Sequence, residues 1–324
     1  MDLLSVLTIF GGLAFFLYGM HVMSENLEKL SGGRFESIIT TLTSGKLKSV
    51  FWGTAITAAM QSSSAVTVML VGFVNSGIIP FENSLGIIFG SNIGTTLTAW
   101  ILSLAGIKND SIFFKIFNPA FFTPVIAIIG ILFVMIPKKQ LKKDIGSILI
   151  GFSILMYGME LMTGTIGNNI NSFSYMLTKF QSPILCLIMS MLFTAIIQSS
   201  AATIGMVQAL TITENLTFTL AACMVLGANI GTCMTAYLSS FGTNKNAKRV
   251  VAAHVYMNVI GTLLFLIIFY GLKFTSAEKI IESPATSVSV AAFHTIFNVA
   301  TTAVLFPFYG PLIKLIKFSV RSKK

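Results

Sequence analysis

The sequence predicts an all-α polytopic membrane protein made of two inverted repeats, each with a re-entrant helical hairpin and a broken transmembrane helix. Three observations lead to this prediction. Hydrophobic residues make up 54% of the 324 residues and charged residues only 10%, which is too little charge to cover a soluble surface. Polar motifs recur in the two halves of the chain at identical spacing. Basic residues are concentrated in a few segments between apolar runs.

The internal repeat consists of three short motifs that each occur twice in the same order. They are Tyr-Gly-Met at 18–20 and 157–159, Gln-Ser-Ser at 61–63 and 198–200, and Gly-x-Asn-Ile-Gly-Thr at 90–95 and 227–232. Asn92 follows Gln61 by 31 positions, and Asn229 follows Gln198 by the same 31 positions. Two polar motifs at one fixed distance indicate that the two halves arose by duplication.

The first half contains two apolar stretches on either side of Gln-Ser-Ser-Ser, and each is too short to cross a bilayer that needs about 20 residues. We therefore expect a re-entrant hairpin with this motif at its tip. The expected segments are a crossing at 3–23, a polar connection at 24–46, the hairpin at 47–79, a crossing at 84–107 interrupted at Gly90–Gly94, and a crossing at 116–136.

The second half repeats this order. The expected segments are a crossing at 145–163, a hairpin at 184–213, an interrupted crossing at 217–241, a crossing at 250–271, and a last apolar segment at 285–312 outside the repeat. Each half then holds an odd number of crossings, so the second half is inverted relative to the first. The predicted domains are 1–144 for the first repeat, 145–272 for the second, and 273–324 for the last helix and a basic tail.

The placement of the basic residues sets the orientation. They cluster in three places: Lys138, Lys139, Lys142 and Lys143; Lys245, Lys248 and Arg249; and Lys314, Lys317, Arg321, Lys323 and Lys324. With the N-terminus outside, all three clusters and the C-terminus lie in the cytoplasm, as the positive-inside rule requires. The sequence therefore predicts a multi-pass protein of the cell membrane. The net charge of +10 does not predict a nucleic-acid partner, because it is divided among short loops.

The Gln-Ser-Ser elements are the predicted site. A polar run in the middle of an apolar hairpin interrupts helical hydrogen bonding, and unwound backbone is tolerated within a membrane only where it lines a cavity or is buried in protein. N–H groups at the start of a helix favour anions, while hydroxyl, amide and carbonyl oxygens suit a small cation such as sodium. The alternative is that these serines only pack and hydrogen-bond between helices.

The same residues carry a family resemblance. Gln-Ser-Ser followed by Gly-x-Asn-Ile-Gly-Thr, occurring twice, resembles the paired signature of the type II sodium/phosphate cotransporter family. The resemblance implies symport of inorganic phosphate with sodium, without a cofactor. It implies phosphate binding by Gln61, Ser62, Ser63, Ser64, Gln198, Ser199 and Ser200, and sodium binding or support of the site by Asn92, Thr95, Asn229 and Thr232. Ala201 stands where the family often has a third serine, so the sodium ligands stay open.

Several alternatives remain open at this point. The same fold could transport another oxyanion, export phosphate, or sense phosphate without moving it. An enzyme is not expected, because no base lies in a motif with the serines. His254 with Asn258 and His294 with Asn298 share one spacing, which favours hydrogen bonds between helices over proton coupling. The expected partners are phosphate, sodium and the lipid bilayer, with a homodimer and a separate cytoplasmic regulator left open.

Overall fold

The computed structural model describes residues 2–31, 34–41, 45–104, 119–179, 181–276 and 278–321. This part of the chain is helical, with one isolated bridge and no β-strand. Six of its helical segments are long and apolar enough to cross a membrane. They are α1 (Leu3–Ser31), α5 (Phe81–Ser103), α8 (Gln140–Asn168), α12 (Phe218–Ser239), α13 (Lys245–Leu272), and the segment Ser287–Ser319, which comprises α15 (Ser287–Leu305), η3 (Phe306–Phe308) and α16 (Tyr309–Ser319). The all-α membrane fold is confirmed.

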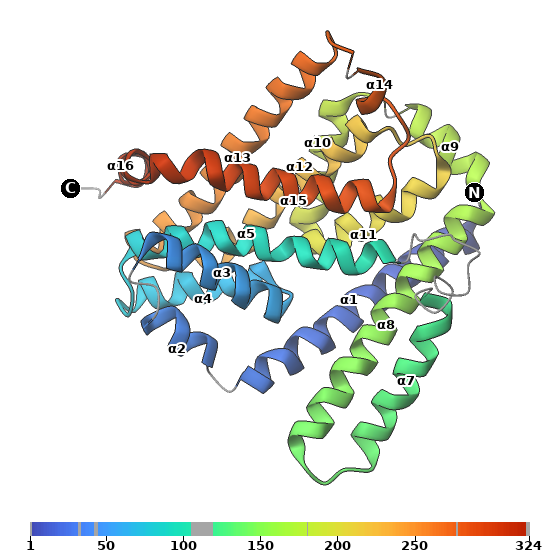
Figure 1. Ribbon diagram of the computed structural model, residues 1–324, viewed down its shortest axis with the longest axis horizontal. Helices are drawn as coiled ribbons and strands as arrows, with labels where there is room; N and C mark the ends of the chain where they lie inside the picture. The colour runs from blue at the N-terminus through green and yellow to red at the C-terminus, as the bar shows by residue number, and fades with distance from the viewer. Residues whose placement is uncertain are drawn as a thin grey trace.

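The remaining helices are shorter. They are α2 (Arg34–Thr41), α3 (Lys46–Met60), α4 (Ser63–Asn75), α7 (Pro119–Met135), α9 (Ile170–Lys179), α10 (Pro183–Ile197), α11 (Ser200–Leu210), η2 (Thr211–Thr213) and α14 (Glu278–Ile281). In Figure 1, α7 and the adjoining part of α8 extend beyond the other helices, and the two chain ends lie at opposite ends of the molecule. Part of the predicted crossing at 116–136 and the loop before it lie outside the described residues.

The structure divides each predicted hairpin into two short helices. The arms α3 and α4 have 15 and 13 residues, and α10 and α11 have 15 and 11. At 1.5 Å per residue the longest arm measures about 22 Å, which is shorter than the apolar core of a bilayer, about 30 Å thick. Gln-Ser stands at the junction of each pair of arms.

The prediction of a broken transmembrane helix in each half is wrong. Both α5 and α12 run continuously through the Gly-x-Asn-Ile-Gly-Thr motif. The glycines instead let a hairpin arm approach closely: a Cβ added to Gly90 would overlap the carbonyl oxygen of Val50 in α3, and one on Gly227 would overlap that of Leu187 in α10. Glycine in a membrane helix permits such approach without breaking the helix.

These glycine contacts are the same in the two halves. A Cβ on Gly94 would lie 2.5 Å from the carbonyl oxygen of Thr54, and a Cβ on Gly231 would lie 2.5 Å from that of Met191. Thr54 precedes Gly94 by 40 positions, as Met191 precedes Gly231. The pairing of α3 with α5 is therefore repeated by α10 with α12, which supports the duplication. The domain boundaries at 144 and 272 stay predictions.

The long helices α1 and α8 also contact each other reciprocally. A Cβ on Gly19 would overlap the backbone of Leu155, and a Cβ on Gly158 would overlap the backbone of Phe16. Both glycines come from the repeated Tyr-Gly-Met motif, and each touches the residue three positions before the other. Reciprocal contacts of this kind are what a twofold axis between two related units produces. The inversion of the halves relative to a membrane stays a prediction.

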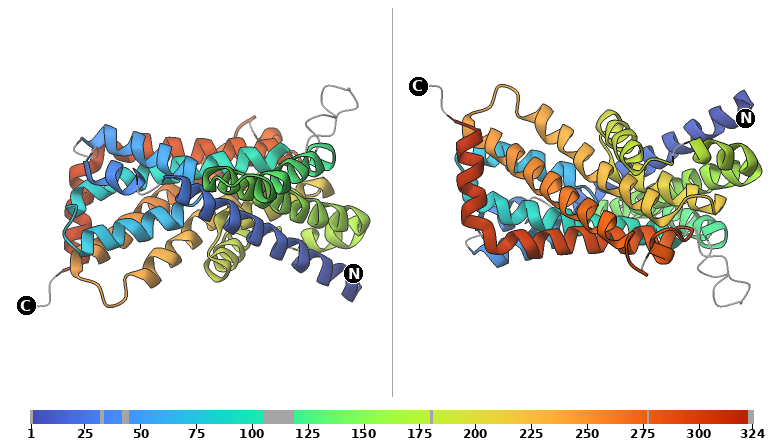
Figure 2. Two further views of the ribbon diagram at one scale, coloured as in Figure 1. Left: turned by 90° about the horizontal axis from the view of Figure 1, so that it is seen from below. Right: turned by 90° about the horizontal axis from the view of Figure 1, so that it is seen from above.

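Two predicted segment ends are corrected by the structure. The first helix continues to Ser31 instead of ending at residue 23, because polar residues extend it past the apolar run, with Lys29 paired to Glu25 at 2.7 Å. The last apolar segment is not one straight helix. It turns at η3, which contains Pro307, and α16 then runs across the end of the molecule instead of continuing α15 (Figure 2).

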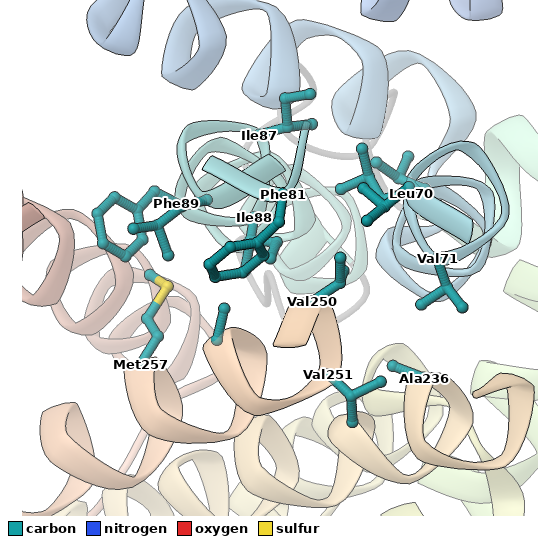
Figure 3. Close-up of a cluster of buried hydrophobic side chains, with 14 of the residues drawn as sticks. Leu70, Val71, Phe81, Ile87, Ile88, Phe89, Ala236, Val250, Val251 and Met257 are labelled. Carbon is teal, nitrogen blue, oxygen red and sulfur yellow. The ribbon is translucent and has the colours of Figure 1, made fainter. Parts of the chain in front are cut away.

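A buried core joins the two halves. Figure 3 shows side chains of α4 and α5 from the first half meeting side chains of α12 and α13 from the second, including Leu70, Ile88, Ala236 and Met257. All four side chains are buried. The hairpin arm α4 is therefore packed against the other half, and α11 is likewise packed against α5. Each hairpin reaches from its own half into the other.

Candidate functional site

The backbone at both hairpin tips has the same unusual conformation. Gln61 and Gln198 have φ of 54° and 59°, in the left-handed region, and each ends the first arm of its hairpin. The serine that follows each of them is extended and begins the second arm. A left-handed residue other than glycine costs about 1–3 kcal/mol, and such strain is concentrated at functional sites. The same strain at equivalent positions in two repeats marks the tips as candidates.

The serines at the tips divide into two kinds. Ser62 and Ser199 cap the second arms: the Oγ atoms accept hydrogen bonds from the backbone N–H groups of Ala65 and Ala202, each at 3.2 Å. Ser63 and Ser200 are the first helical residues and are 7% and 6% exposed. The cap satisfies only one of the N–H groups of a first turn, so other donors at these helix starts keep their capacity for a ligand.

The tips bring helix ends of opposite polarity together without ionised side chains. Each tip joins the carbonyl end of one helix, which is partially negative, to the N–H end of the next, which is partially positive. Gln-Ser-Ser itself is neutral, and within the described residues no group of three or more His, Cys, Asp or Glu side chains could hold a metal ion. The arrangement can accept an anion at one helix end and a small hard cation at the other.

The two tips differ in how their glutamines are held. Thr98 of α5 donates a hydrogen bond to Gln61 Oε1 at 2.8 Å, and Gln61 Nε2 donates to the carbonyl of Ala58. Thr235 stands 37 positions after Gln198, exactly as Thr98 follows Gln61, but its Oγ1 is buried without a hydrogen-bond partner. Gln198 is exposed, whereas Gln61 is half-buried. The glutamine of the first tip is hydrogen-bonded to the neighbouring helix, whereas that of the second tip is not, although Ser199 donates a weak hydrogen bond to Met20 Sδ of α1 at 4.0 Å.

Replacing Thr98 with valine tests this fastening. Thr98→Val keeps the shape of the side chain and removes the donor to Gln61, which is worth about 1 kcal/mol. For the phosphate transport that the family resemblance implies, we expect roughly a fivefold rise in the phosphate concentration for half-maximal transport, with little change in protein yield. Thr96→Val is the matched control on the same helix, because the Thr96 hydroxyl donates only to the carbonyl of Ile93 in its own helix. Equal effects of the two substitutions would contradict a positioning role for Thr98.

The four supporting residues predicted from the sequence are not hydrogen-bonded to the tips in this structure. Asn92 donates to Oδ1 of Asn258 in α13 at 3.0 Å. Asn229, Thr95 and Thr232 each donate to a carbonyl of their own helix. Asn92 therefore links α5 to α13. This agrees with the prediction that Asn258 makes hydrogen bonds between helices. No hydrogen bond joins the two tips to each other in the described part of the chain.

Sequence reasoning missed part of a buried polar face on α15. His294, Asn298, Thr301 and Thr302 lie within two to three helical turns, and each has a buried polar side-chain atom without a partner. On α13, Thr262 has such an atom as well, next to Gly261, whose added Cβ would lie 2.6 Å from Thr301 Oγ1. The His-x-x-x-Asn spacing was the available signal, but the threonines resemble ordinary packing residues. Buried polar atoms need water or a ligand, so this face is expected to be hydrated.

The family model and the similar proteins found by comparison point to the same family. The family model described as Na+/Pi-cotransporter matches residues 15–164 and 166–296. "Uncharacterized protein YqeW" of Bacillus subtilis is 29% identical over 95% of this chain and 96% of its own length. "Putative inorganic phosphate export protein YjbB" of Escherichia coli is 24% identical over 99% of this chain but only 57% of its own length.

Another relative matches only part of the chain. "Sodium-dependent phosphate transport protein 2A" of Rattus norvegicus is 34% identical over 33% of this chain and 18% of its own length. No solved structure matches the chain.

Proposed function

The chain belongs to the Na+/Pi-cotransporter family, and from this membership we propose that it moves inorganic phosphate together with sodium across the cell membrane by alternating access. Phosphate transport is the function that the family and the named relatives indicate. The observation that supports the tips as the site is the left-handed glutamine at both of them, each followed by a helix start.

The neutrality of the tips gives a physical reason for sodium. A phosphate anion moved from water into a neutral pocket of low dielectric is unfavourable unless opposite charge accompanies it. N–H groups starting α4 and α11 are the proposed phosphate donors, with Ser63, Ser64 and Ser200 beside them. Carbonyls ending α3 and α10, with hydroxyl and amide oxygens of the tips, are the proposed sodium ligands. Ala201 supplies no hydroxyl, so we propose that the two tips do not bind sodium equally.

The difference between the tips supports alternating access. Gln61 is hydrogen-bonded to Thr98 while Gln198 is exposed and Thr235 has no partner. Because the two tips are equivalent in the repeat, we propose that the tip with the hydrogen-bonded Gln61 is closed and that the tip with the exposed Gln198 is open. We propose that transport exchanges the two arrangements, with the Gln198–Thr235 contact forming when the Gln61–Thr98 contact is released.

Transport by the purified protein tests the proposal directly. In proteoliposomes, an inward sodium gradient should raise the initial rate of radiolabelled phosphate uptake at least tenfold over an equal potassium gradient. Dissipating the gradient with a sodium ionophore should abolish accumulation above equilibrium. Uptake that is indifferent to sodium would contradict coupling, and phosphate binding without flux would favour a sensor.

Export is the second candidate, because the Escherichia coli relative is named for phosphate export. The same site serves both directions, since gradients decide the net flux of a coupled carrier. Cells that express the chain and are loaded with phosphate distinguish the two. Net release under a physiological inward sodium gradient would favour export, and net accumulation would favour uptake. A sulfate or arsenate competitor in the same assay measures selectivity among oxyanions.

A further inference from the structure

A groove of about 640 Å³ lies where α12, α13 and α16 meet. It is at the end of the molecule that carries the C-terminus. Its walls are largely apolar and aromatic, and they include Tyr237, Phe241, Val251, Val255 and Tyr256. None of the predicted phosphate or sodium residues lines the groove.

The wall of the groove that α16 forms is held in place by specific contacts. The turn at η3 directs α16 across the helix ends, and Tyr309 Oη donates to the carbonyl of Glu82 at 2.6 Å. Lys317 pairs with the carboxylate of Glu82. At the far end of α16, Arg249 Nη2 donates to the carbonyl of Val320 at 3.3 Å. The helix is therefore fastened to α5 at its beginning and to α13 at its end.

The mouth of the groove is positively charged. Lys248 and Arg321 line it and are exposed, and the guanidinium of Arg321 lies 3.8 Å from the centre of the Phe318 ring. No acidic residue lines the groove among the described residues. The nearest carboxylate that contacts α16, that of Glu82, is already paired with Lys317. Neither Lys248 nor Arg321 has an ion-pair partner among the described residues. An apolar interior beneath two such cations is complementary to an amphiphile with a negative head.

We propose that this groove binds an anionic phospholipid, with an acyl chain against the apolar walls and the headgroup phosphate between Lys248 and Arg321. Tyrosine and phenylalanine side chains that are half in water and half in apolar surroundings are typical of the membrane interface. Basic pockets between membrane helices on the cytoplasmic side are a known mode of recognition for acidic headgroups. The basic clusters place this end of the molecule in the cytoplasm by the same rule used for the topology.

Lipid titration of the detergent-purified chain tests the proposal. Native mass spectrometry should show phosphatidylglycerol bound in preference to phosphatidylcholine with the same acyl chains. The variant Lys248→Gln/Arg321→Gln should bind phosphatidylglycerol roughly 30-fold more weakly, because each basic residue near an acidic surface contributes about a fivefold factor. The matched control is Lys138→Gln/Lys139→Gln, which removes two exposed lysines directly before the start of α8 and should leave binding unchanged.

A second variant tests the groove itself without altering charge. Ala252 lies on the wall of the groove and is half-buried, so Ala252→Trp should fill the space and lower binding of phosphatidylglycerol at least tenfold. Equal binding of the two lipids, or undiminished binding by both groove variants, would overturn the proposal. Displacement of the lipid by millimolar inorganic phosphate would also overturn it, since the site would then recognise free phosphate.

Discussion

Gly90→Val is expected to prevent the chain from folding into a stable monodisperse protein. A Cβ at this position would overlap the carbonyl oxygen of Val50, which is backbone within α3 and cannot rotate away. Separating α3 from α5 to make room would cost about 3 kcal/mol or more in lost packing. Size-exclusion chromatography of detergent extracts should show loss of the monodisperse peak, and Gly227→Val should behave in the same way at the equivalent contact with Leu187.

The matched control for this prediction is Gly72→Val. Gly72 lies in α4, in the same half of the chain, and a Cβ added there would meet nothing within 4 Å. This variant should elute and melt as the unchanged protein does, because helix propensity favours valine slightly over glycine. If Gly90→Val eluted like Gly72→Val, the close approach of α3 to α5 would not describe the folded protein.

Gln198→Glu is expected to reduce phosphate transport roughly 100-fold or more at pH 8. Glutamate keeps the size of the side chain and places a negative charge at the exposed tip proposed to receive phosphate. Two unit charges about 4 Å apart repel by about 4 kcal/mol at the effective dielectric near a protein surface, and 1.4 kcal/mol is a tenfold change in affinity. Initial rates of radiolabelled phosphate uptake measure the loss.

Acidification should reverse part of that loss. The introduced carboxyl loses its charge when it is protonated, so the ratio of variant to unchanged uptake should rise as the pH falls. Gln198→Met is the neutral control of similar size, and it should reduce uptake by only about tenfold because it removes the proposed hydrogen bond to Thr235 without adding charge. Wild-type uptake by the glutamate variant, or a ratio that does not depend on pH, would argue against phosphate binding at this tip.

The sequence was sufficient to predict two short helices around each Gln-Ser-Ser but not the continuity of the longer helices beside them. Short apolar arms around Gln-Ser-Ser have no other arrangement that satisfies their backbone in a membrane, so the prediction at 47–79 followed from length alone. The glycines at 90 and 94 predict a break in the helix from sequence alone, yet they form the surface on which α3 packs. The sequence alone cannot distinguish a helix break from a site of close helix packing, because both favour glycine. The position of the neighbouring helix decides between them.

The candidate site is also only partly predictable from the sequence. The repeated motifs identified Gln61 and Gln198, because polar residues within apolar arms are expensive and their spacing recurs. The partner of Gln61 is Thr98, and it also lies at a repeated distance, but the role of a hydroxyl on another helix depends on helix rotation. Asn92 was expected near the tips and instead bonds Asn258. The packing of the helices determines which buried polar residues face each other, and the sequence alone does not predict how the helices are positioned.

The close glycine contacts also limit which parts of the protein can move. Because backbone lies directly on backbone, α3 cannot slide along α5, nor α10 along α12, without steric collision. Each pair is expected to move as one rigid body, and a fluorescent or spin-label pair at the exposed positions Phe51 of α3 and Leu97 of α5 should report one unchanging separation throughout the cycle. The second arms, α4 and α11, contact the opposite half through side chains, among them Leu70 of α4 and Gln208 of α11, whose Nε2 donates to the carbonyl of Ala99. We therefore infer that the left-handed glutamine between the two arms is the hinge about which α4 and α11 move relative to α3 and α10.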